Sequence, residues 1–197
     1  SEGKPVLTIE GHESLREADL LGSFIPKDGG FVWADGVLVQ AMREGAYLFV
    51  DEANRMPART LNVLLGCISR RAVRLTEHGS EEVIAADGFQ IVMAMNLGKA
   101  YAVNGTDRAL LNRFDTKLQF DYLDPAHEIR LLIAKTGISE KIAAIMVKVA
   151  GETRRLRREH QNTAELSPRN LFAWAQKFSA RKGKRQDCLI DAAEVTW

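Results

Sequence analysis

The feature that most constrains the fold is a pair of short segments that are apolar on both faces. Residues 46–50 read AYLFV and residues 89–95 read FQIVMAM, without a regular alternation of apolar and polar side chains. Central strands of a parallel sheet are covered on both faces, so they form such continuous apolar runs. The sequence therefore predicts an α/β fold built on a parallel sheet. Residues 6–9 and 117–122 are weaker strand candidates.

The segment between these two strands predicts a helix followed by a hairpin. In residues 57–71 the leucines recur at helical spacing, and Pro57 suits a first helical turn. The next stretch, RAVRLTEHGSEEVIAADG, predicts a hairpin that turns near His78. The stretch SFIPKDGGFVWADG predicts a second inserted hairpin, with its turn at Gly29 and Gly30.

The last third of the chain is helical in character. Asp124 and Pro125 form a strong helix start, a capping side chain followed by proline, and Gly137 is a natural stop. A second helix follows, and Ser167 with Pro168 opens a third. We therefore expect an α/β domain at residues 1–123 and an all-α domain at residues 124–197.

Composition excludes few classes of protein. Lys plus Arg (27) nearly balances Asp plus Glu (26), so no overall charge favours nucleic acid or a membrane surface as a partner. No apolar stretch approaches membrane-spanning length. Cys67 and Cys188 fit no metal or redox spacing, and a cytoplasmic location is expected. The four histidines lack ligand spacing, so no metal site is assigned to them.

Polar side chains follow both central strands. Asp51 and Glu52 come after the first strand, and Asn96 comes after the second. Ligands of open α/β sheets bind outside the carboxyl ends of the strands. This set suits hydrolysis of a nucleoside triphosphate: Asp51 would hold the water shell of Mg²⁺, Glu52 would orient the attacking water, and Asn96 would position that water or touch the γ-phosphate.

Phosphoryl transfer also needs cations, and two arginines are candidates. Arg113 lies in ALLNRFD, and Arg169 falls in the first turn of the helix that Ser167 opens. A positive charge at a helix N-terminus interacts unfavourably with the helix dipole, at a cost of about 0.3–1 kcal/mol. Each residue alone has an ordinary structural explanation: the acids as helix caps, Asn96 as a turn residue, the arginines as ion-pair partners. Their joint order favours the catalytic interpretation.

These segments together resemble the motifs of AAA+ ATPases. YLFVDEANR resembles a Walker B motif, MAMN a sensor-1 strand, DRALLNRF an arginine-finger segment and AELSPRNLFAWA a sensor-2 helix. Within that superfamily the chain resembles the MoxR-like and dynein-related branch over about residues 6–182. GHESLREADLLGSF is similar to the branch's segment after the second strand, and the two hairpins match its helix-2 and pre-sensor-1 insertions.

The resemblance implies a partial three-layer αβα core with a parallel sheet, followed by a small all-α lid. It implies ATP and Mg²⁺ as cofactors, with Asp51 as the magnesium-associated acid and Glu52 as the catalytic glutamate. Asn96 would be sensor 1, and Arg169 would be sensor 2, reaching the nucleotide from the lid.

The resemblance also implies assembly and partners. Arg113 would act in trans, on nucleotide held by the neighbouring subunit of a ring that is usually hexameric, and Arg108 would be a second interface arginine. Such relatives are chaperone-like remodellers that activate partner enzymes or insert metals into them. They often work with a von Willebrand A-type protein.

One expected motif is absent from the sequence. No G-x-x-x-x-G-K-[ST] Walker A loop occurs in residues 1–197. In the family this loop precedes the strand that corresponds to residues 6–9. Three explanations are a shortened chain, an upstream segment that was removed or is not represented, and a naturally degenerate ATPase. The joint presence of Glu52, Arg113 and Arg169 favours the first two. Residues 1–197 alone are expected to bind ATP poorly or not at all.

Other interpretations stay open. DEAN can be compared with helicase boxes, although no second recombinase-like sheet is evident, and a scaffold domain that only makes ring contacts is the non-enzymatic alternative. The basic run ETRRLRREH at residues 152–160 is expected to form a solvated or subunit-facing surface rather than a nucleic-acid site. Trp33 is expected to pack at a hairpin base, whereas Phe31 could grip a partner.

Overall fold

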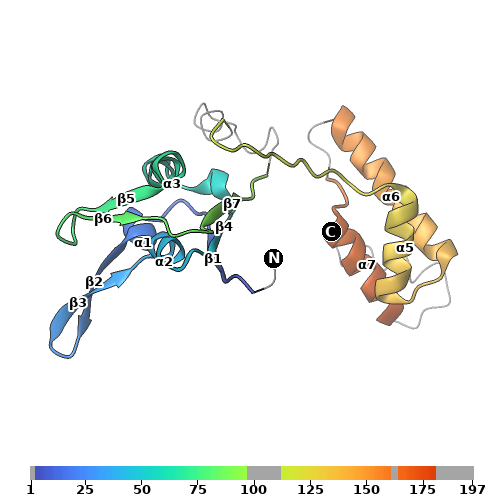
Figure 1. Cartoon of the computed structure of the whole chain (residues 1–197). Helices are drawn as coiled ribbons and strands as arrows, with labels where there is room; N and C mark the ends of the chain where they lie inside the picture. The colour runs from blue at the N-terminus through green and yellow to red at the C-terminus, as the bar shows by residue number, and fades with distance from the viewer. Residues whose placement is uncertain (1–2, 97–111, 161–163, 181–197) are drawn as a thin grey trace. The chain divides into compact units, whose positions relative to one another are not determined.

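The computed structural model describes residues 3–96, 112–160 and 164–180 (Figure 1). The chain divides into two compact units, Ser1–Lys117 and Leu118–Trp197. The domain boundary expected from the sequence lies after Leu123, and that division stays a prediction.

The first unit contains a three-stranded parallel sheet with the order β1-β4-β7. Its strands are β1 (Val6–Glu10), β4 (Tyr47–Asp51) and β7 (Gln90–Met93). β4 is the central strand, and its Leu48 and Val50 are fully buried. The two strands predicted as central are neighbours, and the α/β fold class is confirmed. Only β4 is central in the described sheet, because β7 pairs with β4 alone and its Val92 is 46% exposed.

A helical and hairpin connection precedes each later strand of the sheet. Between β1 and β4 lie α1 (Glu17–Leu21), the hairpin of β2 (Gly22–Lys27) and β3 (Gly30–Asp35), and α2 (Val37–Glu44). Between β4 and β7 lie η1 (Ala53–Arg55), α3 (Ala58–Arg70), and the hairpin of β5 (Ala72–Leu75) and β6 (Glu81–Ile84). Both predicted hairpins and the predicted helix are present, and Figure 1 shows the β2–β3 hairpin extending away from the three-stranded sheet.

The strand predicted at residues 117–122 is wrong. Residues 117–123 adopt no regular element. Leu118 and Phe120, which would form the apolar face of such a strand, are 75% and 88% exposed. An isolated segment gains nothing from extended geometry without a neighbouring strand and an apolar surface to cover, so the alternating pattern alone is insufficient.

Within residues 118–160 and 164–180, the described part of the second unit, three helices share a core of their own. They are α5 (Pro125–Thr136), α6 (Glu140–Glu159) and α7 (Pro168–Ala180). The backbone N–H of His127 donates to the Asp124 carboxylate at 3.1 Å, and Gly137 ends α5 with φ 69°, which confirms the predicted start and stop. The core includes Leu132, Met146, Leu166, Leu171 and Trp174. None of the helices in the described ranges is long and apolar enough to cross a membrane.

The sequence predicted a solvated or subunit-facing surface for the basic run in α6, but not all of the run is exposed. Arg154 is buried and paired with Glu128 of α5. Arg155 is exposed, as expected, and pairs with Glu152 and Glu159 on its own helix. The spacing of four arginines in five residues carries one of them round to the inner side of the helix.

Candidate functional site

The paired acids stand where β4 leaves the sheet. Asp51 is the last residue of the strand, its side chain is exposed, and its Oδ1 accepts a hydrogen bond from the backbone N–H of Glu52 at 2.9 Å. The backbone N–H of Gly11, just after β1, donates to the Asp51 carbonyl at 2.8 Å. The end of β4 is therefore tied to the segment that follows the neighbouring strand.

Glu52 has an unusual backbone conformation. Its φ of 49° and ψ of 38° are left-handed, which costs a non-glycine residue about 1–2 kcal/mol. A Cβ atom placed on Gly11 would lie 2.3 Å from the Glu52 carbonyl oxygen and 2.9 Å from Cγ of Met56. Only glycine fits at position 11 without moving this turn. Backbone strain of this kind concentrates at functional sites, where the surrounding structure maintains it.

The structure brings Glu52 and Asn96 together. Asn96 follows β7, which pairs in parallel with β4, and its Nδ2 donates to Glu52 Oε1 at 3.0 Å. The backbone N–H of Ala53 also donates to the Ala94 carbonyl at 3.0 Å, which joins the turn after β4 to the segment after β7. The two side chains therefore share one edge of the sheet because their strands are adjacent.

Two buried acceptor atoms at this edge have no hydrogen-bond partner within the described part of the chain. They are Oε2 of Glu52 and Oδ1 of Asn54. Leaving a buried polar atom unpaired costs about 1–3 kcal/mol, so each such atom calls for a physical explanation. A carboxylate oxygen held beside a sheet edge with spare lone pairs is suited to accept a hydrogen bond from a water molecule. Asn54 and Gly11 were not identified as site residues from the sequence. The only sequence feature that marks them is that each follows a strand.

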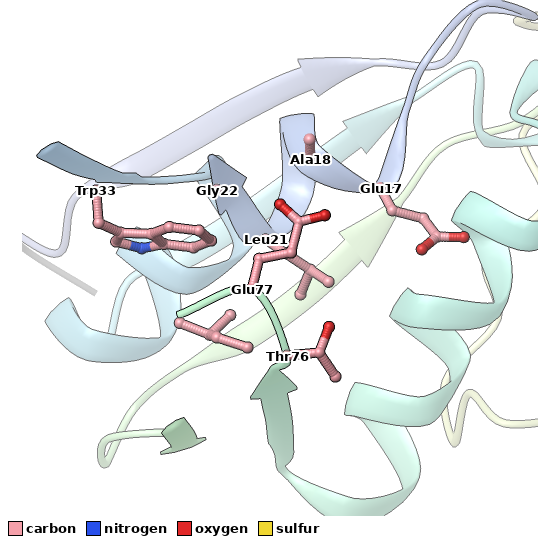
Figure 2. Close-up of a pocket in the computed structure, with 8 residues that line it drawn as sticks. Glu17, Ala18, Leu21, Gly22, Trp33, Thr76 and Glu77 are labelled. Atoms are coloured by element: carbon pink, nitrogen blue, oxygen red, sulfur yellow. The ribbon is translucent and has the colours of Figure 1, made fainter. Parts of the chain in front are cut away.

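A pocket lies elsewhere in the first unit, between the base of the β2–β3 hairpin and the turn of the β5–β6 hairpin (Figure 2). It has a volume of about 70 Å³, and its lining includes Glu17 of α1, Trp33 of β3 and Glu77 of the β5–β6 turn. Known ligand pockets hold about 300–1,000 Å³, so this pocket is too small for a nucleotide. The sheet edge, rather than the pocket, is the candidate site.

The family comparisons agree with this geometry. The model for the AAA domain (dynein-related subfamily) matches residues 1–114, and the CbbQ/NirQ/NorQ C-terminal model matches residues 128–193. The chain belongs to the dynein-related AAA family. It is thus a MoxR-like AAA+ protein, as the motifs indicated.

Similar curated proteins and solved structures extend over nearly the whole chain. Protein NorQ of Paracoccus denitrificans is 30% identical over 98% of this chain and 70% of its own length. The denitrification regulatory protein NirQ of Stutzerimonas stutzeri is 30% identical over 96% of this chain and 68% of its own length. The P216G mutant of Thermotoga maritima RuvB matches with a TM-score of 0.58 at 14% identity, over 98% of this chain and 54% of that chain, and supports the fold alone.

Within this AAA+ chain, the candidate arginines Arg113 and Arg169 belong to different units. Arg113 is exposed, and its Nε donates to Ser69 Oγ of α3 at 3.1 Å. Arg108 lies outside the described residues. Arg169 is an exposed residue in the first turn of α7, where the backbone N–H of Asn170 donates to Ser167 Oγ at 3.2 Å. The arginine roles therefore stay predictions.

The acid edge fits magnesium in a limited way. Among the described residues no group of three or more His, Cys, Asp or Glu side chains is placed to enclose a metal ion. Mg²⁺ needs no such cage, because it keeps several waters and takes one or two carboxylates together with phosphate oxygens. The exposed carboxylate of Asp51 at the strand end meets that requirement.

Proposed function

We propose that the intact protein hydrolyses ATP at the edge where β4 and β7 end. The observation that carries the proposal is the state of Glu52: a strained backbone, one carboxylate oxygen bonded to Asn96 and the other without a partner among the described residues. Membership of the AAA+ family supports the same reaction.

The residues of this edge have separable roles. Glu52 would accept a hydrogen bond from the attacking water through Oε2, while the amide of Asn96 restrains Oε1 and so fixes the carboxylate plane. Asp51 would hold hydrated Mg²⁺, which when bound neutralises charge on the phosphates. These three residues are the ones we propose for the hydrolytic side of the site, and residues 1–197 contain no Walker A motif.

The arginines would complete the site through assembly. An exposed Arg113 is suited to reach nucleotide on the neighbouring subunit of a ring, which we propose to be a hexamer, with Arg108 as a second interface residue. Arg169 would contact the nucleotide as sensor 2. These roles rest on the family resemblance and on the exposure of Arg113 and Arg169.

The output of hydrolysis would be the remodelling of a partner protein. The family resemblance supports a metalloenzyme as the client and a von Willebrand A-type protein as an assisting partner, and one relative is called a denitrification regulatory protein. The β2–β3 hairpin is a candidate for gripping the client, because Phe31 is 74% exposed near its tip. Trp33 instead packs within the unit: its ring lies 5.3 Å from that of Phe24 and stacks on that of His78 at 4.8 Å.

The decisive experiment is a Glu52→Gln substitution in the full-length protein. We expect kcat for ATP to fall by about 10²–10⁴, the usual contribution of a positioned acid or base, with nucleotide binding retained. Glu82→Gln, an exposed acid of β6, is the matched control and should leave kcat unchanged.

The alternatives give different results in the same assay. A wild-type protein that binds no ATP would favour a scaffold domain, and a Glu52→Gln variant with the wild-type rate would contradict the proposed site. Hydrolysis that is stimulated by single-stranded nucleic acid would favour the helicase-like alternative. Stimulation by a partner enzyme, with no response to nucleic acid, is the expected result.

A further inference from the structure

Arg154 has an unusually complete set of partners for a residue with no assigned role. Its side chain is 6% exposed, and two of its nitrogens donate to the two oxygens of Glu128 at 2.9 Å each. Its Nε donates to the carbonyl of Leu166 at 2.9 Å, and its guanidinium lies 4.0 Å from the centre of the Tyr122 ring. One planar cation thus uses its donors and its face at once.

These contacts join three segments to α6. Glu128 belongs to the first turn of α5, and Tyr122 lies in the irregular segment just before that helix. Leu166 immediately precedes Ser167, which caps α7 from the position before its first residue, Pro168. The neighbouring residue Thr153 contributes as well, because the N–H of Leu166 donates to its Oγ1 at 3.1 Å. Both backbone polar groups of Leu166 are therefore bonded to α6.

Leu166 lies next to the residue that caps the first turn of α7. The next residue, Ser167, accepts hydrogen bonds from the N–H of Asn170 through its hydroxyl, and from the N–H of Leu171 through its carbonyl. Arg169 lies inside this turn. Apolar packing is non-directional and tolerates a small slide of one helix along another, whereas hydrogen bonds to both groups of Leu166 fix one register.

Stability alone is a weak reason for the Arg154–Glu128 pair. Burying two charges costs several kcal/mol per ion in desolvation, and apolar residues of similar volume often serve as well or better. The best-attested use of a buried polar group is to select one packing register over others. Here Arg154 donates to the carbonyl of Leu166, and Leu166 leads into the helical turn that contains Arg169.

We propose that Arg154 is a positioning residue: it sets the register of the first turn of α7 against α6, and thereby the direction in which Arg169 projects. The pair with Glu128 holds the guanidinium in place, and Tyr122 covers its face. This inference rests on the proposed function insofar as Arg169 is assigned to the nucleotide.

The positioning itself is tested without nucleotide, on residues 1–197. The double variant Glu128→Leu/Arg154→Met removes the pair without leaving a buried charge unpaired. We expect the helical unit to stay folded, while amide hydrogen exchange of Asn170 and Leu171 accelerates about 10-fold or more as the turn opens locally. The amide of Ala143, in the first turn of α6, is the internal control and should not change. Unchanged exchange at Asn170 and Leu171 would overturn the proposal.

A second variant covers the case in which the double variant fails to fold. Arg154→Lys keeps the charge beside Glu128, but a single ammonium group cannot reproduce the planar fork that reaches Glu128 and Leu166 together. Faster exchange at Asn170 and Leu171 is again the expected result. Exchange as slow as in the wild type would show that the bond to the Leu166 carbonyl does not set the register.

The consequence for catalysis is tested by a mutant cycle in the full-length protein. If Arg154 acts through Arg169, then Arg169→Ala should lower kcat much less in the Glu128→Leu/Arg154→Met background than in the wild type. Independent effects would instead multiply to within about twofold, and that result would contradict the coupling. If Arg169→Ala leaves kcat unchanged in the wild type, the proposed role of Arg169 fails, and the exchange measurement still decides the register.

Discussion

Two glutamates, one in each unit, hold their carboxylates in opposite ways. Glu52 has a left-handed backbone, one hydrogen bond from a neutral amide, and a buried oxygen without a partner among the described residues. Glu128 lies in a regular helix, is 5% exposed, and bonds one guanidinium through both of its oxygens. The first acid is strained and incompletely paired, and the second is relaxed and fully paired.

The difference indicates a chemical role for Glu52 and a structural role for Glu128. An incompletely paired acid lowers stability, so its retention on a strained turn is explained when a ligand or a water molecule uses the spare lone pairs. The remaining lone pairs of Glu128 are shielded from solvent, because the residue is 5% exposed, and its two hydrogen bonds fix the orientation of its partner. Replacing the two residues should therefore change stability in opposite directions.

The largest expected effect is that of Glu128→Ala. The substitution leaves Arg154 buried without its counter-ion, which costs about 3–5 kcal/mol of unfolding free energy in the helical unit. Trp174 of the helical core reports this in a denaturant titration, provided that the signals of the other tryptophans are assigned by substitution. Lys148→Ala, at an exposed position of α6, is the control and should cost less than about 0.5 kcal/mol. A loss as small as the control's would mean that the pair is not structurally important.

Glu52→Gly should have a smaller effect of the opposite sign. Relief of the left-handed backbone is worth about 1–2 kcal/mol, and the extra freedom of glycine in the unfolded chain offsets part of it, so a net gain of about 0.5–1 kcal/mol is expected in the first unit. The measurement is unfolding free energy together with the ATPase rate of the full-length protein, which should fall.

Ser80→Gly is the matched control for this substitution. Ser80 also has a left-handed backbone, with φ 60°, but it lies in the turn of the β5–β6 hairpin. We expect a comparable gain in stability with no change in ATPase rate. If Glu52→Gly destabilises the unit while Ser80→Gly stabilises it, the hydrogen bond from Asn96 outweighs the strain, and the contrast with Glu128 is weaker than proposed.

The same contrast explains which parts of the fold could be predicted from the sequence. The continuous apolar runs of β4 and β7 are local signals, and so are the Asp124 cap and the Gly137 stop of α5. Helix α2 was missed because it has only eight residues, begins with β-branched Val37 and lacks a capping side chain at Gly36. Its stability comes from burial, with Leu38 and Met42 fully covered.

The candidate site divides in the same way. Asp51, Glu52 and Asn96 could be proposed because each follows a strand, and parallel strands end at one edge. Gly11 could not, because the need for glycine there arises from the Glu52 carbonyl, which follows a different strand and would lie only 2.3 Å from a Cβ atom placed on Gly11. The burial of Arg154 could not be predicted either, because a run of arginines in a sequence does not indicate which of them faces a buried acid.

The smallest expected effect is on the pH dependence of stability. It concerns Tyr122, whose ring lies over the guanidinium of Arg154. Burial raises the pKa of Tyr122 above its ordinary value of 10.0, and the nearby Glu165 raises it further, although the charge of Arg154 opposes the shift. Because the folded-state pKa is the higher one, the folded state binds the proton more tightly. This contribution to stability is complete below pH 10 and is lost as the pH rises through the folded-state pKa.

Tyr122→Phe should remove that pH dependence while keeping the ring over the guanidinium. The measurement is the difference in unfolding free energy between wild type and Tyr122→Phe, followed from pH 8 to pH 11, which cancels the titration of lysines and of other tyrosines. The wild type should lose stability relative to the variant above pH 10. A difference that stays constant would mean that the hydroxyl is as well solvated in the folded state as in the unfolded chain. In that case Tyr122 covers Arg154 only loosely. The Arg154–Glu128 pair would then be more accessible to water, and its contrast with Glu52 at the sheet edge would be weaker.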